Sequence, residues 1–353
     1  MAGTRALRVA VVGAGAFGRN HLRVLRELQQ SGQAVELVAV VDRDSAAVAA
    51  ASEKFGVPGF ETIEACLTAV GGLDAASVCV PTMHHASAAA PLLAAGVDLL
   101  IEKPLAASLA DADLILELAR KHGRVVQVGH LERFNPAVTA AQQHLHKPMF
   151  FEAHRLSIFT PRSLDVDVVL DLMIHDLDIV LSLVVSPVRE VRAVGLPVLS
   201  RKVDIANVRV EFENGCIANF TASRVSTERV RKLRFFQPHQ YLSLDFARQD
   251  LLMIDVTAAA GMDPAMLAAL AEKAQQAGAL PGGHPSAGLS LKKVTVDLGE
   301  PLRLEIEAFL QAVRERSRPV VSGEDGRAAL ALALEINEAI MVHAERAGLQ
   351  DFL

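Results

Sequence analysis

The stretch Val9-Ala-Val-Val-Gly-Ala-Gly-Ala-Phe-Gly18 decides the fold of the first half of the chain. Its apolar beginning predicts a buried strand, and the pattern from Arg19 to Gln30 predicts a helix directly afterwards. Between them stands Gly-x-Gly-x-x-Gly, which is typical of a dinucleotide-binding turn. Gly13 permits the tight turn, Gly15 lets the backbone approach a pyrophosphate, and Gly18 lets the helix pack closely. Because the helix N-terminus offers free N–H groups to phosphates, we expect the cofactor to contact Gly13, Gly15, Ala16, Phe17 and Gly18.

The next predicted strand, Val35–Val41, ends on Asp42, where an acid is expected to accept hydrogen bonds from ribose hydroxyls. A carboxylate there would repel the 2′-phosphate of NADP, which favours NAD, whereas the neighbouring Arg43 would neutralise that phosphate. The alternative is a strand–helix turn that needs its glycines for packing alone. Together, the glycine pattern and Asp42 favour dinucleotide binding, with NAD ahead of NADP and with Arg43 also in contact with the cofactor.

Helix and strand patterns alternate as far as about residue 130, which indicates a parallel sheet covered on both faces. Ligands bind such sheets at the carboxyl ends of the strands. Three predicted strand ends carry polar side chains: Pro81-Thr-Met-His-His85, Glu102-Lys-Pro104 and Gly129-His-Leu-Glu-Arg-Phe-Asn-Pro136. Lys103 beside a nicotinamide would exchange protons with a substrate oxygen, although a charged surface turn is the alternative. We also expect cofactor contacts, without acid–base roles for the histidines, from Pro81, Thr82, His84, His85 and Glu102.

The stretch Asp165–Leu183 places a thin line of ionisable groups along an otherwise apolar segment. Read as a helix, it brings four of them into a sector roughly 80° wide: Asp167, Asp171, His175 and Asp178. Buried carboxylates and imidazoles cost free energy unless they are paired. We therefore expect this line to form the wall of an active site. The alternative is a polar helix edge that meets solvent.

From Met149 onward the apolar pattern has period two, which predicts a second sheet. Glu213-Asn-Gly215 is a hairpin signal, with positive φ expected at both central residues. The basic run that includes Arg224 is either a solvated strand edge or a site for a nucleotide-sugar diphosphate, with Arg224 as first candidate. Residues 257–289 form an Ala/Gly-rich insertion that the sequence leaves open as a lid, an oligomer contact or a mobile excursion.

Composition narrows the class of protein. The 353 residues leave room for two domains, and no run approaches the ~20 apolar residues of a membrane span. A net charge of −6 with scattered basic residues argues against a nucleic acid as partner. Because Cys66, Cys79 and Cys216 show no metal-ligand spacing, we expect no metal and a reducing cytoplasm.

In combination, these motifs resemble the Gfo/Idh/MocA oxidoreductases over essentially the whole chain: Gly13–Gly18, Asp42, Pro81–His85, Glu102–Pro104 and Asp171-x-x-x-His175. The resemblance implies an α/β protein with an N-terminal NAD-binding Rossmann domain, a doubly wound parallel sheet. A C-terminal α/β domain with a large, mostly antiparallel open sheet follows. The implied catalytic groups are Lys103, Asp171 and His175, and Thr82 departs from the Asn that the family often has. We expect domains at 1–130 and 131–325, a C-terminal helix at 326–353 packing back on the first, and a homodimer or homotetramer through the second sheet.

A narrower resemblance rests on segments 129–136, 204–209, 220–225 and 231–245. They are similar to a bacterial branch of the family around UDP-N-acetylglucosamine 3-dehydrogenase, which implies oxidation of a sugar 3-hydroxyl on the way to lipid A. The substrate would then be bound by Lys103, His130, Arg133, Asn135, Asp171, His175 and Arg224. Alternatives are a dehydrogenase for a cyclitol, a free sugar or a uronic-acid nucleotide, and a non-catalytic NAD-sensing regulator.

Overall fold

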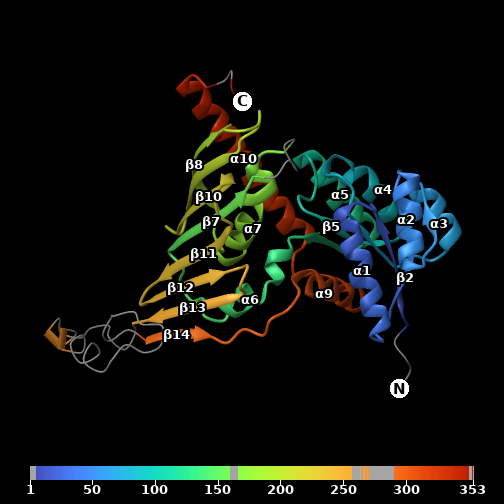
Figure 1. Ribbon diagram of the computed structural model, residues 1–353, viewed down its shortest axis with the longest axis horizontal. Helices are drawn as coiled ribbons and strands as arrows, with labels where there is room; N and C mark the ends of the chain where they lie inside the picture. The colour runs from blue at the N-terminus through green and yellow to red at the C-terminus, as the bar shows by residue number, and fades with distance from the viewer. Residues whose placement is uncertain are drawn as a thin grey trace. The chain divides into compact units, whose positions relative to one another are not determined.

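A computed structural model describes residues 5–159, 166–256, 263, 265–266, 268–269, 290–349 and 352. The chain divides into two compact units (Figure 1). Unit 1 comprises Met1–Phe134 and Gly299–Leu332, and unit 2 comprises Asn135–Leu298 and Ala333–Leu353. Helix α10, Gly323–Ala347, begins in unit 1 and continues in unit 2. Domain boundaries near residues 130 and 325 stay a prediction.

Unit 1 is built on a six-stranded parallel sheet with the order β3-β2-β1-β4-β5-β6. The strands are β1 Leu7–Val12, β2 Val35–Val41, β3 Gly59–Phe60, β4 Ala75–Val78, β5 Asp98–Glu102 and β6 Val126–Gly129. The helices and short helical turns are α1 Ala16–Gln30, α2 Ser45–Phe55, α3 Ile63–Val70, η1 Thr82–His84, α4 His85–Ala94, α5 Leu109–His122, η2 Leu131–Phe134 and α9 Pro301–Glu315. The strand order changes direction beside β1, and such a switch point is where doubly wound folds bind ligands.

Local chemistry explains where the helices of unit 1 begin and end. The carboxylate of Asp44 accepts hydrogen bonds from two N–H groups in the first turn of α2, and the hydroxyl of Ser108 accepts one from the first turn of α5. Both helices end at a left-handed glycine, Gly56 and Gly123. Helix α9 packs against α1 and adds Ile306, Phe309 and Leu310 to the core around β1. The segment 299–332 thus completes the apolar core of unit 1.

Unit 2 contains an eight-stranded sheet with the order β14-β13-β12-β11-β7-β10-β9-β8. The strands are β7 Phe150–Ile158, β8 Val188–Leu196, β9 Ile205–Phe212, β10 Ile217–Ser226, β11 Val230–Gln237, β12 Gln240–Asp245, β13 Asp250–Asp255 and β14 Ser290–Val294. Strands β7 and β10 pair in parallel, and every other neighbouring pair is antiparallel. The expected fold class, a parallel Rossmann sheet followed by a mostly antiparallel sheet, is confirmed.

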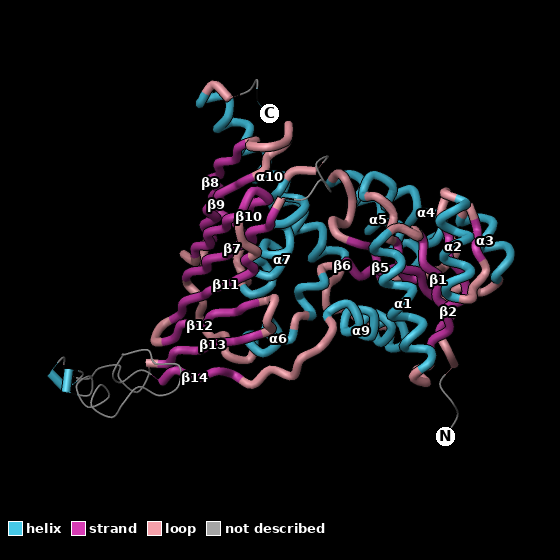
Figure 2. The backbone as a smooth tube through the Cα atoms, viewed as in Figure 1, coloured by secondary structure: helices cyan, strands magenta, loops and turns pink. Residues whose placement is uncertain are grey.

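One face of the second sheet is buried and largely apolar, and the other is more exposed and mixes polar side chains with aromatic ones such as Phe150 and Phe236. The buried side chains of β7 and β10 include Phe151, Ala153 and Phe220, whereas Asn207 and Thr221 pair with each other on the opposite face. Helices α6, Pro136–Gln142, and α7, Ile174–Leu183, lie on the same side of the sheet (Figure 2). They therefore cover its apolar face.

The expected hairpin connects β9 and β10, but its turn differs from the expected one. Gly215 has a φ of +83°, and its N–H donates to the carbonyl oxygen of Phe212. Asn214 does not have positive φ, and its side chain accepts a hydrogen bond from the N–H of Cys216. Positive φ is thus needed at one position instead of two, because the asparagine side chain supplies a turn contact of its own.

Most of the insertion at 257–289 lies outside the described residues. Within the part of the chain that the structure describes, no helix is both long enough and apolar enough to cross a membrane.

Candidate active site

The glycine-rich turn between β1 and α1 is shaped by close backbone contacts. Gly13 has a φ of +106°, and a Cβ there would lie 2.6 Å from the carbonyl carbon of Cys79. A Cβ on Gly18 would lie 1.7 Å from the carbonyl oxygen of Gly13. Gly15 precedes α1, and among the described residues no atom comes within 4 Å of the Cβ it lacks. Two glycines are therefore required by packing, while the third leaves open space at a helix N-terminus, a kind of position that commonly binds phosphate groups.

Two predicted cofactor residues, Ala16 and Phe17, form the first turn of α1. The ring of Phe17 is 43% exposed, and its centroid lies 6.3 Å from that of His21. An apolar ring held at the surface next to the glycine turn suits contact with a bound nucleotide.

A cavity of about 290 Å³ adjoins the ends of β1, β2 and β4, and Asp42 forms part of its lining. Oδ2 of Asp42 accepts a hydrogen bond from the N–H of Ala14 at 2.6 Å, and Oδ1 accepts one from Asp44 at 3.0 Å. The acid is thus held against the glycine turn. The cavity has the remaining lining residues Val12, Val41, Arg43, Glu61, Thr62, Ile63, Glu64, Val80, Pro81, His84, Ser87, Ala88 and Pro91.

Sequence reasoning missed Glu61 and Glu64, which line this cavity with Asp42. The only signal was their place after β3, a strand of two residues that is too short to recognise from its pattern. Three carboxylates and one guanidinium, that of Arg43, therefore surround the cavity. Because negative charges outnumber positive ones around the cavity, the 2′-phosphate of NADP would be disfavoured there.

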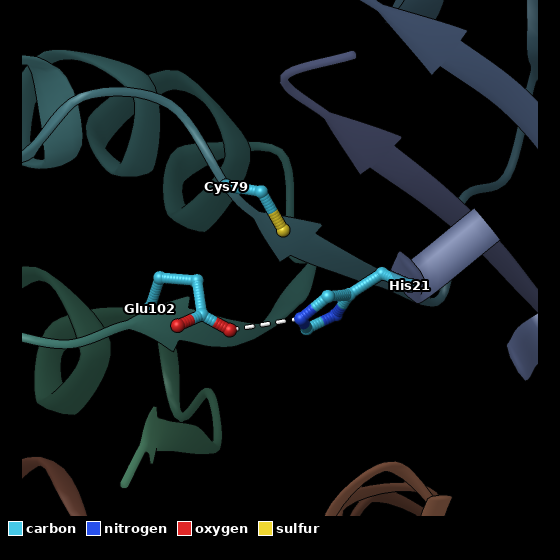
Figure 3. Close-up of side chains that lie close together, drawn as sticks. All are labelled: His21, Cys79 and Glu102. Carbon is cyan, nitrogen blue, oxygen red and sulfur yellow. Dashed lines mark hydrogen bonds and ion pairs between the residues drawn. The ribbon is translucent and has the colours of Figure 1, made fainter. Parts of the chain in front are cut away.

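Lys103 lies in the turn after β5, between Glu102 and Pro104, and each of these two neighbours contacts a buried histidine. Nε2 of the buried His21 lies 2.8 Å from Oε1 of Glu102 (Figure 3). The Lys103–Pro104 peptide bond is cis. Beyond it, the carbonyl oxygen of Pro104 lies 3.0 Å from Nδ1 of His85. Lys103 itself is partly exposed at the carboxyl edge of the sheet, where the sequence predicted it.

His85 is 1% exposed, and both of its ring nitrogens face backbone carbonyl groups. Nε2 lies 2.9 Å from the carbonyl oxygen of Val80, opposite the contact to Pro104. Burial lowers the pKa of His85, while the carbonyl contacts oppose that shift. The ring links the ends of β4 and β5, and its predicted contact with the cofactor stays a prediction. Thr82 is partly buried in the adjacent turn η1.

His130 follows β6 and is 1% exposed. Burial lowers its pKa to about 3, and the charges of Lys103 and Arg133 act in the same direction. The side chains of Lys103 and Arg133 are therefore close enough to His130 for their charges to affect its protonation. The guanidinium of Arg133 donates to the carbonyl oxygen of Val320 at 3.1 Å.

The buried His130 should make unit 1 sensitive to acid. Its pKa lies near 3 in the folded protein against an ordinary 6.5, so between these values the unfolded chain binds a proton that the folded chain does not. Stability therefore falls as the pH drops below 6.5, and between pH 7.5 and 5 this group accounts for about 2 kcal/mol. Urea unfolding at the two pH values should show a smaller loss for His130→Leu than for the wild type. His122→Leu should keep the wild-type loss, and an equal loss in His130→Leu would contradict the assignment.

In unit 2, the predicted helix at 165–183 contains a π-helical turn, Val169–Met173, before α7. The turn holds Asp171, and such turns often occur at functional sites. Asp171 and His175 are partly exposed, whereas Asp178 is buried. Asp167 accepts hydrogen bonds from the N–H groups of Val169 and Leu170 and from Asn337. Of the predicted polar line, Asp167, Asp171 and His175 are partly exposed, and Asp178 is buried.

Asp176, on the side opposite the predicted line, makes a buried ion pair. Nη2 of Arg155 lies 2.8 Å from Oδ1 of Asp176, and Nε lies 2.9 Å from Oδ2. The guanidinium carbon of Arg155 also lies 5.2 Å from the centre of the Phe246 ring. A paired, two-point contact of this kind fixes α7 on β7.

Two predicted substrate residues of unit 2 take part in local contacts. Asn135 caps α6 by accepting from the N–H of Ala137, and its amide donates to the carbonyl oxygen of Phe246. Arg224 is 6% exposed, with Nε 3.4 Å from Oδ1 of Asp204 and a hydrogen bond to the carbonyl oxygen of Val166. Their roles in substrate binding stay predictions.

The structure gathers the glycine turn, Asp42, Pro81, Glu102, Lys103 and His130 along the carboxyl edge of one parallel sheet. Asp171 and His175 lie on one helical segment of unit 2. Each half of the predicted site is therefore assembled within its own unit.

Comparison with known proteins identifies both halves of the chain. Residues 7–130 match the oxidoreductase family model with an NAD-binding Rossmann fold, and residues 137–237 match the GFO/IDH/MocA C-terminal domain. UDP-N-acetylglucosamine 3-dehydrogenase of Acidithiobacillus ferrooxidans is 33% identical over 341 residues, covering 96% of this chain and 99% of that protein. Its solved structure superposes with a TM-score of 0.83 at 32% identity, covering 98% and 100% of the two chains.

Two further proteins are similar to this chain, one in part of its sequence and one in its fold. An inositol 2-dehydrogenase of Corynebacterium glutamicum is 36% identical over 135 residues, which cover 38% of this chain and 39% of that enzyme. A levoglucosan dehydrogenase in complex with NADH and L-sorbose shares the fold with a TM-score of 0.80 at 16% identity, covering 96% and 97% of the two chains.

Proposed function

The chain belongs to the Gfo/Idh/MocA family and is an NAD-binding oxidoreductase, and from this premise we propose that it oxidises C3 of UDP-N-acetylglucosamine. The observation that carries the proposal is the full-length similarity to the Acidithiobacillus ferrooxidans enzyme. It extends through the second unit, which carries the proposed substrate residues Asp171, His175 and Arg224. The 3-keto product would feed an amino-sugar route of the lipid A type. A cytoplasmic location and a homo-oligomer formed through the second sheet belong to the same proposal.

The residues of unit 1 fit the cofactor. The open space at Gly15 would take the diphosphate, the N-terminus of α1 would donate N–H groups to it, and Asp42 would accept from the adenosine ribose. When bound there, NAD would supply the acceptor for the hydride that leaves the carbinol carbon of the substrate. The turn after β5 would then present Lys103 to the substrate oxygen.

The protein side of the reaction is a proton transfer. We propose that Lys103 or His175 accepts the hydroxyl proton of the substrate and that Asp171 orients His175 and stabilises its charge. Closely placed ionisable groups titrate together, so pH profiles report the set of groups and not one member. His130, Arg133, Asn135 and Arg224 would complete the substrate site, with Arg224 next to the diphosphate.

The substrate is tested with a panel of UDP-N-acetylglucosamine, UDP-glucose, UDP-glucuronate, free N-acetylglucosamine and myo-inositol. Formation of NADH is followed by absorbance. We expect the highest kcat/KM with UDP-N-acetylglucosamine, because it is the compound of this panel that carries both an acetamido group and a diphosphate. Faster turnover of myo-inositol would replace this proposal with a cyclitol dehydrogenase, which the inositol 2-dehydrogenase similarity favours as second candidate.

We propose that NAD is preferred over NADP. Asp42, Glu61 and Glu64 line the adenosine cavity with Arg43, so a 2′-phosphate would meet more negative than positive charge. Asp42→Asn should reduce the ratio of kcat/KM for NAD over NADP by about tenfold or more, equivalent to ~1.4 kcal/mol. Glu36→Gln removes an exposed carboxylate of β2 outside the cavity and should leave the ratio unchanged. A wild type that prefers NADP would overturn the assignment.

A further inference from the structure

Two buried histidines flank Lys103 without any role in the mechanism given above. His21 belongs to α1, three residues after the glycine turn, and is 0% exposed. His85 begins α4 and is 1% exposed. One contacts Glu102 and the other contacts Pro104, the residues immediately before and after Lys103.

The side chain of Glu102 is enclosed on several sides. Nε2 of His21 donates to Oε1 across 2.8 Å, and a Cβ on Gly129 would lie 3.0 Å from the same oxygen. The thiol of Cys79 lies on a third side (Figure 3). Its sulfur, a ring nitrogen of His21 and a carboxylate oxygen of Glu102 all lie within 4.8 Å of one another. Burial, together with the charges of Glu102 and Glu305, raises the pKa of Cys79, so the group remains a thiol. Glu102 therefore has little freedom to change its rotamer.

A metal ion is a weaker interpretation of the same cluster, although sulfur, nitrogen and oxygen donors suit zinc. His21 and Glu102 already satisfy each other at a hydrogen-bond distance. Nδ1 of His21 has no hydrogen-bond partner among the described residues, whereas a histidine that binds a metal normally donates its second N–H to an acceptor. The geometry is that of a hydrogen-bonded pair with a thiol packed beside it.

His85 holds the opposite side of the turn. Its ring bridges the carbonyl oxygens of Val80 and Pro104 at 2.9 and 3.0 Å. A neutral imidazole has one N–H, so it donates to one carbonyl at a time while packing against the other. The ends of β4 and β5 are joined through this ring.

We propose that His21 and His85 are positioning residues that fix Glu102 and Pro104, and thereby set the location of the Lys103 amine. The proposal rests on the proposed role of Lys103 in proton transfer. Catalysis is sensitive to such placement, because a shift of about 1 Å in a reacting group can cost roughly 10²-fold in rate. Because α1 also carries the glycine turn, His21 connects the diphosphate-binding element directly to the turn that bears the lysine.

The test compares His21→Leu and His21→Gln with the wild type, using UDP-N-acetylglucosamine as substrate. Leucine fills the space without a donor, and we expect kcat to fall about 10- to 100-fold. KM for the sugar and the NADH dissociation constant, measured by fluorescence, should stay within about threefold. Glutamine retains an N–H that reaches Glu102 and should recover most of kcat. His85→Leu should lower kcat as His21→Leu does. The control variant His122→Leu, at the end of α5, should behave as wild type.

A second measurement does not depend on turnover. The free protein is acylated at limiting reagent, and the labelling rate of Lys103 is compared by mass spectrometry with that of exposed Lys121. His21→Leu and His85→Leu should change this ratio at least threefold, while His21→Gln and His122→Leu should not. An unchanged ratio in folded His21→Leu and His85→Leu, judged by thermal unfolding, would overturn the positioning role. If the wild type oxidises no member of the panel but the ratio still changes, the proposed function fails and the positioning role survives.

Discussion

Lys103→Met should lower kcat for UDP-N-acetylglucosamine oxidation by roughly 10²- to 10⁴-fold, the contribution typical of one positioned acid–base group. Methionine keeps the length of the side chain and removes its ammonium group. The NADH dissociation constant should change little, because the diphosphate and adenosine contacts lie on other strand ends. Steady-state kinetics and fluorescence titration measure the two quantities separately.

Lys121→Met provides the matched control for this experiment. Lys121 is exposed on α5, so its removal should leave both quantities at their wild-type values. Wild-type turnover in Lys103→Met would refute the assigned role of Lys103. A larger loss in His175→Asn than in Lys103→Met would identify His175 as the main proton acceptor.

The second large effect is expected in the glycine turn. A Cβ at residue 18 would lie 1.7 Å from the carbonyl oxygen of Gly13, so Gly18→Ala must displace either α1 or the turn. Overpacking of this kind costs about 1–3 kcal/mol, and NAD affinity should fall about 100-fold or more because the phosphate-binding N–H groups move. Thermal unfolding and calorimetric titration with NAD measure the two effects.

The Gly15→Ala variant should affect the binding of NAD without affecting the packing of the protein. Among the described residues nothing lies within 4 Å of the added Cβ, so the unfolding free energy should stay within about 0.5 kcal/mol of the wild-type value. NAD affinity should still fall about tenfold, because the methyl group occupies the space assigned to the diphosphate. If Gly15→Ala binds NAD as the wild type does, the diphosphate does not approach this residue.

Much of unit 1 could be predicted from local pattern. The order of apolar strands, the glycine turn and Asp42 each rest on residues adjacent in sequence, and the structure places them at one edge of a parallel sheet. Glu61 and Glu64 escaped prediction because the strand before them has two residues. Two residues are too few to show the alternation of apolar and polar side chains that identifies a strand.

The polar line at 165–183 shows where local pattern is insufficient. A regular helix at 100° per residue would place four ionisable side chains in one sector, but a π-helical turn at Val169–Met173 changes the angular relation between the two halves. Asp176, which is not part of that line, is the buried partner of Arg155. The partner comes from β7, 21 positions earlier in the chain, and cannot be recognised from the helix.

The sequence by itself determined the alternation of strands and helices, the diphosphate turn and the change to period-two strands, because these depend on backbone freedom and on side-chain period within a few residues. Only the tertiary structure decided which ionisable side chains form hydrogen bonds or ion pairs with one another. His21 meets Glu102 across 81 positions, and Arg224 is buried against Asp204. Such pairs form where packed elements bring two side chains to within about 3 Å, and that distance is a property of the packing rather than of either local sequence.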